Sequence, residues 1–173
     1  MAATALRFYR PARTLTESIY DLDWDSPAAS SAALTQHSRE FIIPSGESTR
    51  QFVVTTSELP RWLEPALAGF SALLSLRENW DSYGGRKTSD ELIVQALDVL
   101  THIMELNSPV PSVVPLGDGG LQLEWHRKQQ DLEIVFHLDA VPTFFYQNRR
   151  TQKEREGFAT DAVVLAAVFA NIA

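Results

Sequence analysis

The sequence contains no cysteine, and this absence removes several kinds of chemistry. Without thiols the chain forms no disulfide, offers no thiolate to a metal ion and has no cysteine nucleophile. The absence says nothing about the redox compartment, because reduced and oxidised environments both tolerate cysteine-free chains.

A long apolar segment is also lacking. The longest apolar stretch, residues 162–170, is far shorter than the ~20 residues that cross a bilayer. Residues 1–14 carry arginines but no apolar run of the kind found in a signal peptide. These features predict a cytoplasmic protein without a membrane partner.

Positive charge is scarce, with 15 Lys and Arg against 22 Asp and Glu and a net charge of −7. Phosphate backbones are bound by clustered Lys and Arg, so nucleic acid is not the default partner. The plainest role of the acidity is solubility. A length of 173 residues and an apolar content of 45% fit a single globular domain.

The chain divides near residue 35. Within residues 1–35, acidic and apolar side chains alternate over 21–25, around Trp24, and a run of small residues follows at 26–33. This pattern predicts a flexible arm or linker. Residues 36–173 are predicted to form a single α+β domain. Within it, the β-rich runs 39–43 and 51–55 flank a turn and indicate a hairpin.

Apolar spacing predicts two central helices. The first spans about 59–77, with Ser57 as its N-cap and Pro65 as a point where it is expected to be interrupted. The second begins after Thr88 or Ser89 and extends to about residue 106, before Pro109.

A proline-rich extended piece at 111–116 and three closely spaced strands at 121–126, 132–138 and 143–147 follow. Short connections favour antiparallel neighbours. A polar stretch, 149–157, leads to a last helix at about 159–171. The predicted fold is α+β: an antiparallel β-meander of three to five strands packed against two central helices and a C-terminal helix. That last helix is apolar on more than one side, so we expect it to be sandwiched or to form a homodimer interface.

Two short segments combine glycines, aromatics and acids, namely residues 79–85 and 118–126. In the first, Trp80 and Tyr83 are interpreted as filling a gap between the helices and the sheet, with Asp81 accepting loop amides or capping the next helix. The alternative is that Trp80, Asp81 and Tyr83 form a binding hot spot. Residues 117–120 precede a strand, which favours a strand-entry turn over a phosphate cradle.

Strand alternation places polar side chains on one face of the predicted sheet: Gln122, Glu124, His126, Asp131, Glu133 and His137. A turn over 127–130 sets His126 near Asp131 and Glu124 opposite Glu133. Two opposed glutamates repel each other unless a cation, a partner's basic side chain or a shared proton intervenes. They can instead extend into water, where screening makes the repulsion small.

Catalytic and metal sites are not predicted. The histidines are not spaced as a metal clamp, and no serine lies in a nucleophile-elbow sequence. Two opposed carboxylates match the ~5 Å of retaining glycosidases, yet nothing indicates a sugar cleft. We therefore assign no cofactor. The basic cluster around Arg149 and Arg150 is expected to be a solvated approach to the last helix, or to meet a phosphate or an acidic partner.

Across residues 75–147 the chain resembles a group of small bacterial proteins of uncharacterised function. They carry a Trp-Asp-x-Tyr-Gly loop, matched by Trp80 to Gly84, and a Gly-Gly-x-Gln-Leu-Glu-Trp strand, matched by Gly119 to Trp125. The resemblance implies a bacterial origin and a shared fold. It implies no catalytic residues.

The predicted function is a non-enzymatic protein-binding module with a partner that is expected to be basic. Such a module is typical of the antitoxin-like, immunity-like or accessory member of a bacterial protein pair. Two alternatives are a small hydrolase that uses Glu and His on the sheet face, and an anion- or nucleotide-binding regulator that uses Arg149 and Arg150.

Overall fold

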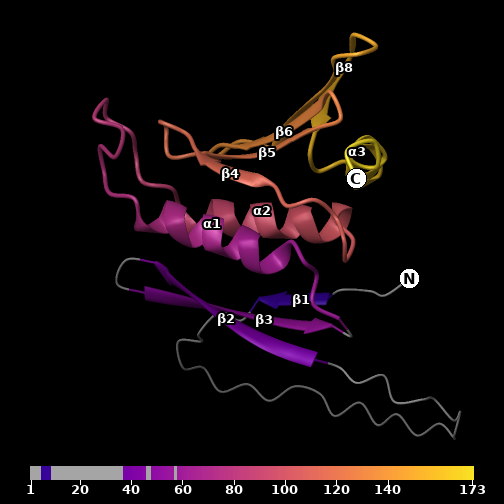
Figure 1. Ribbon diagram of the computed structural model, residues 1–173. Coiled ribbons are helices and arrows are strands. Elements are labelled where there is room, and N and C mark those ends of the chain that lie inside the picture. The colour runs from indigo at the N-terminus through magenta and orange to yellow at the C-terminus, as the bar shows by residue number, and fades with distance from the viewer. Residues whose placement is uncertain (1–4, 9–36, 46–47, 57) are drawn as a thin grey trace, which may run out of the picture.

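A computed structural model describes the backbone of residues 5–8, 37–45, 48–56 and 58–173, and the side chains from residue 58 onward. Two helices, α1 (Leu63–Ser75) and α2 (Asp90–Ile103), lie between two antiparallel sheets (Figure 1). The sheet below them in that view contains three strands and the sheet above them contains five. The chain therefore forms an α+β fold in which both sheets face the helix pair.

The three-stranded sheet has the order β1-β3-β2, from β1 (Ala5–Phe8), β2 (His37–Ser45) and β3 (Ser48–Thr56). Pairing of β2 with β3 confirms the predicted hairpin. Residues 5–8 of the predicted arm pair with β3 at its other edge, from Ala5 opposite Thr55 to Phe8 opposite Phe52. The rest of that arm lies outside the described residues, so its flexibility stays a prediction.

Both central helices are shorter than predicted. Helix α1 begins after Trp62, four residues later than expected, and the proposed cap Ser57 lies outside the described residues. Pro65 falls in the first turn, where the backbone N–H has no helical partner to lose, so the helix continues through it. Helix α2 begins after Ser89, whose hydroxyl accepts from the amide of Glu91 at 3.1 Å.

The five-stranded sheet is a meander of β4 (Ser112–Pro115), β5 (Leu121–Arg127), β6 (Gln130–Phe136), β7 (Thr143–Asn148) and β8 (Lys153–Phe158), in that order. One face meets the helices and carries the buried side chains Leu121, Leu123, Trp125, Leu132, Ile134, Phe136, Phe144 and Tyr146. The predicted meander and its buried face are thus confirmed.

Strand β8 was not predicted. The sequence pattern predicts a solvated approach to the last helix at 149–157, but the second half of this stretch pairs with β7. Asn148 explains the reversal: its side-chain oxygen accepts from the amides of Arg150 and Thr151, both at 3.1 Å, which starts a turn. Gln152 completes that turn with φ of 55°.

Helix α3 (Ala162–Phe169) begins after Asp161, whose carboxylate accepts from the amide of Val164 at 3.1 Å. It is shorter than the predicted 159–171. Leu165, Val168 and Phe169 are buried, and the ring of Phe169 meets that of Trp125 edge-on, with centroids 5.3 Å apart. Val163 is 82% exposed, so a homodimer through this helix stays a prediction. Among the described residues, no helix has the length and apolarity to span a membrane.

Candidate binding surface

The face of the five-stranded sheet that points away from α1 and α2 is called the outer face here. Strand register arranges its side chains in three transverse rows. The histidine row contains His126, Asp131, Gln147 and Glu154. The glutamate row contains Ser112, Glu124, Glu133, Phe145 and Glu156. The valine row contains Val114, Gln122, Val135, Thr143 and Phe158.

The two predicted glutamates lie opposite each other, but in different surroundings. One carboxylate oxygen of Glu124 accepts a hydrogen bond from the side-chain Nε2 of Gln122 at 2.9 Å, and the other oxygen lies 3.3 Å from Nε2 of His126. Glu133 makes no such contact within the described part of the chain; its neighbour on β7 is Phe145. Hydrogen bonds at Glu124 therefore offset part of the expected repulsion between the two glutamates. Glu133 has no such compensating contact among the described residues.

His126 connects the glutamate row to the histidine row. Its Nδ1 lies 2.6 Å from Oδ1 of Asp131, on the neighbouring strand. Hydrogen bonds to Asp131 and then to Glu124 raise the pKa of His126 above its usual 6.5. The imidazole is therefore more readily protonated here than in water, and its positive charge sits between two carboxylates.

Asp131 is 6% exposed, yet it carries charge on the outer face. Burial alone would raise its pKa, but hydrogen bonds from His126 and Arg149 lower it. The Arg149 guanidinium binds the carboxylate through two nitrogens, with Nη2 at 2.8 Å from Oδ1. Arg149, predicted as a binding residue, is thus occupied within the fold.

His137 lies apart from this network. It follows β6 at the opposite end from His126, and its Nδ1 contacts the carboxylate of Asp118. The pKa of Asp118 is held below its ordinary value mainly by the hydrogen bond from the amide of Gly120. Burial opposes this effect, and the hydrogen bond and charge of His137 lower the pKa further. The structure therefore does not bring the two histidines together, and no metal-binding group of three or more His, Asp or Glu occurs among the described residues.

The loop at residues 79–85 is held by its own side chains. Asp81 accepts from the amides of Tyr83 and Gly85, both at 2.8 Å, as predicted. These two bonds lower the pKa of Asp81. Asn79 accepts from the amide of Gly84 at 2.7 Å. The loop therefore has a defined shape at the surface.

Tyr83 does not fill a gap in the core, as one interpretation expected, because it is 94% exposed at the loop. Trp80 is half-buried and its indole N–H donates to the carbonyl of Arg86 at 3.2 Å. The amide of Arg86 in turn donates to Gly117 at 3.0 Å. Gly119 also lies close to this stretch, because a Cβ there would be 3.2 Å from Cβ of Arg86. The residues that directly follow the first motif segment therefore pack against the start of the second.

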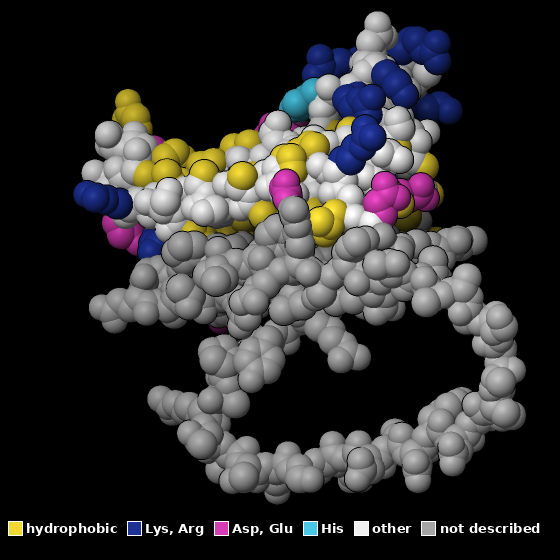
Figure 2. Space-filling model, turned by 60° about the horizontal axis from the view of Figure 1, so that its bottom comes forward, with side chains coloured by type: hydrophobic (Ala, Val, Ile, Leu, Met, Phe, Trp, Pro, Cys, Tyr) yellow, Lys and Arg dark blue, Asp and Glu magenta, His cyan; other side chains and the backbone are white. Residues whose placement is uncertain are grey.

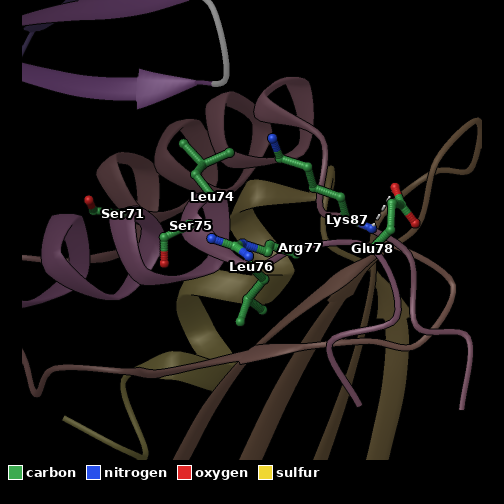
Figure 3. A pocket seen from close by; sticks show the side chains of 7 residues that line it. All are labelled: Ser71, Leu74, Ser75, Leu76, Arg77, Glu78 and Lys87. Carbon is green, nitrogen blue, oxygen red and sulfur yellow. Dashed lines mark hydrogen bonds between the residues drawn. The ribbon is translucent and has the colours of Figure 1, made fainter. Parts of the chain in front are cut away.

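Hollows occur elsewhere on the described surface. One of about 490 Å³ lies at the C-terminal end of α1 (Figure 3) and is lined by Ser71, Leu74, Ser75, Leu76, Arg77, Glu78 and Lys87. Another, of about 190 Å³, lies between α2 and the start of α3. Neither is lined by a predicted site residue. Arg150 does line a third hollow, of about 420 Å³, at the turns that end β5 and β7.

Comparisons with protein-family models, curated proteins and solved structures find no match to this chain. The resemblance to small bacterial proteins accordingly stays a prediction, and the surface itself carries the functional argument.

Sequence reasoning missed the aromatic part of the outer face. Phe145 is 36% exposed and Phe158 is 61% exposed. The signal was present at residues 144–146, where three consecutive aromatics occupy one strand. Because successive side chains alternate between faces, the middle one must leave the core when its neighbours enter it.

Proposed function

We propose that the protein is a docking module that binds a basic segment of a protein partner on the outer face, without a catalytic step of its own. The observation that carries this proposal is the position of Phe145 between Glu133 and Glu156 in the glutamate row. An exposed aromatic ring between two carboxylates is complementary to an arginine or lysine side chain.

The chemistry of such a contact follows from the three side chains. A guanidinium stacks on an aromatic face within ~6 Å of its centroid and also pairs with carboxylates. Glu133 has no competing cation among the described residues, whereas Glu124 is already bonded to Gln122 and His126. A cation of the partner that binds at Glu133 would therefore relieve the repulsion between Glu124 and Glu133.

Apolar contacts extend the surface beyond this cation position. Val135 is half-buried and Phe158 is 61% exposed in the neighbouring valine row. Binding energy in protein interfaces concentrates at aromatic anchors surrounded by a polar rim. The outer face has this composition, with Phe145 and Phe158 near glutamates.

The enzymatic alternative has less support from the geometry. Of its proposed groups, His137 lies apart and bonds to Asp118. Both ring nitrogens of His126 are already engaged, by Asp131 and by Glu124. The hollows of about 490, 420 and 190 Å³ are lined by other residues than Glu124 and Glu133.

The proposal is tested with a defined probe, a ten-residue peptide of alternating arginine and leucine, titrated into isotopically labelled protein. We expect amide resonances of β6, β7 and β8 to shift most. The Glu133→Gln/Glu156→Gln variant should bind at least tenfold more weakly, mainly through a slower association rate that depends on salt.

A matched control removes the same charge from exposed positions on and after α2, in Glu91→Gln/Glu105→Gln. It should retain the affinity for the peptide within about twofold, since distant surface charges are screened. Equal losses in both variants, or shifts confined to other elements, would refute docking at the glutamate row. The natural partner is then sought by affinity purification with the two variants side by side.

A further inference from the structure

The turns that end two hairpins lie side by side at one end of the five-stranded sheet. The amide of Arg149, in the β7–β8 turn, donates to the carbonyl of Gln129, in the β5–β6 turn, at 2.8 Å. Gln130 also pairs with Asn148 at the end of the β6–β7 ladder. These contacts fix the two turns relative to each other, so the space between them has a defined shape.

A hollow of about 420 Å³ lies at these two turns. Five residues line it: Lys128, Gln129, Gln130, Asn148 and Arg150. Its volume falls within the ~300–1,000 Å³ of small-molecule sites. The ligand class therefore depends on which polar atoms these residues offer.

Two of the amide side chains that line the hollow, those of Gln130 and Asn148, can donate hydrogen bonds to a ligand. The carboxamide oxygen of Gln130 accepts from the hydroxyl of Tyr146. The carboxamide oxygen of Asn148 accepts from the amides of Arg150 and Thr151. An amide side chain whose oxygen is engaged presents its NH₂ group to other ligands. Gln130 and Asn148 therefore retain NH₂ donors, and they line the hollow together with the cationic residues Lys128 and Arg150.

Basic residues are frequent in the two hairpins that form the hollow. Basic side chains gather where β8 and its turn lie, at the upper right of Figure 2. Those contributed by the two hairpins are Arg127, Lys128, Arg149, Arg150, Lys153 and Arg155. Arg149 is occupied by Asp131, and one N–H of Lys128 reaches the carbonyl of Ala173 at 3.2 Å. Lys128 retains two further N–H groups, and Arg150 remains at the hollow.

We infer that this hollow binds the phosphate groups of a small phosphorylated molecule of about nucleotide size. Lysine, arginine and amide N–H groups together match the oxygens of a phosphate. Glu154 lies on the strand that leaves the β7–β8 turn, and the chain has a net charge of −7, which opposes a long polyanion more than a compact one. The hollow lies at the hairpin turns, so this inference is independent of docking at the glutamate row.

Calorimetric titration of the full chain with pyrophosphate, at low salt and in an amine buffer, tests the inference. We expect saturable 1:1 binding, and at least a tenfold loss of affinity in Lys128→Gln/Arg150→Gln. The matched control Arg61→Gln/Arg86→Gln removes the same charge from exposed positions outside the hollow and should change the affinity less than threefold.

A second variant, Gln130→Glu, distinguishes a loss of pyrophosphate binding from a loss of folding. The carboxylate still accepts from Tyr146, so the melting temperature should stay close to that of the wild type, while its negative charge should abolish pyrophosphate binding. Wild-type protein that fails to bind at millimolar pyrophosphate, or equal losses in the control variant, would overturn the inference.

Two further titrations identify the source of the phosphate. Tighter binding of ATP than of pyrophosphate would support the inference and show that a nucleoside contributes. Equal binding would also support it and assign recognition to the phosphates alone. Binding of a twelve-nucleotide single strand without any binding of pyrophosphate would overturn it in favour of a nucleic-acid surface.

Discussion

The imidazole of His126 lies 2.6 Å from the carboxylate of Asp131 across the β5–β6 pair. Their hydrogen bond raises the pKa of His126 and lowers the pKa of Asp131. Protonated His126 and ionised Asp131 thus favour each other, and Glu124 adds a second carboxylate on the other side of the ring.

This pair makes part of the stability dependent on pH. Because the folded pKa of His126 lies above its unfolded value of 6.5, its contribution is fully present below pH 6.5 and is lost as the pH rises through the folded pKa. We expect His126→Gln to be less stable than wild type at pH 5.5 by up to about 1 kcal/mol, a modest figure because the ring is half-exposed.

Urea unfolding of both proteins from pH 5.5 to 9 measures this difference. The gap in unfolding free energy should narrow toward the alkaline end. A gap that is constant across that range would show that His126 acts through packing alone.

Gly120 is a position where a side chain does not fit. A Cβ there would lie 2.5 Å from the carbonyl oxygen of Phe136, on the neighbouring strand. Gly120→Ala should therefore cost about 1–3 kcal/mol, because the ladder must move. Gly117→Ala is the control, since its Cβ would meet only Asp81 at 3.8 Å. Similar unfolding midpoints for the two variants would contradict the close approach.

Trp125 joins the sheet to α3 through its contact with Phe169. Trp125→Ala should lower the free energy of unfolding by about 3–5 kcal/mol, as large core truncations do. Val163→Ala, on the exposed side of α3, should change it by less than about 0.5 kcal/mol. Denaturant midpoints give both values, and a small loss at Trp125 would mean that α3 adds little to the core.

The opposed glutamates are predicted to respond differently to neutralisation. Glu133→Gln removes repulsion and breaks no contact to the described residues, so we expect a gain of a few tenths of a kcal/mol, at most about 1. Glu124→Gln also removes the carboxylate that His126 contacts, so it should give no net gain. Thermal melts at pH 6 compare them, and an equal gain in both variants would argue against a role for His126.

Homodimer formation through α3 is tested at its exposed residue. If Val163 lies in an interface, Val163→Lys should convert a dimer into a 19.3 kDa monomer in sedimentation velocity at micromolar concentration. A wild-type protein that already sediments as a monomer would leave α3 as an element that packs only within its own chain.

Much of the fold follows from local pattern. The alternation in 121–126 and 132–136 placed Leu123 and Ile134 inside and Glu124 and Glu133 outside, because period-2 burial permits one register. Strand β8 escaped prediction because its exposed residues, from Lys153 to Glu156, show no apolar alternation. Its existence depends on hydrogen bonds to β7, which sequence periodicity does not report.

The candidate surface was predicted only in part. His126, Asp131 and the glutamates were placed by register, which sequence can supply. The hollow between the hairpin turns could not be foreseen, because Lys128 and Arg150 are far apart in sequence and their turns come together only through the pairing of β6 with β7. Tyr83 was misplaced because aromatic residues usually enter a core, and the side chains of Asn79 and Asp81 set the loop that exposes it.

The two sheets differ in how far apart their partners lie along the chain. In the meander each strand pairs with the next, so its contacts close short loops, and such contacts form quickly. Strand β1 instead joins β3 across the segment from Phe8 to Phe52, a loop whose closure entropy is larger. We therefore expect the meander to form before β1 pairs with β3. During translation β1 is synthesised before β3, so it stays unpaired until β3 has been made.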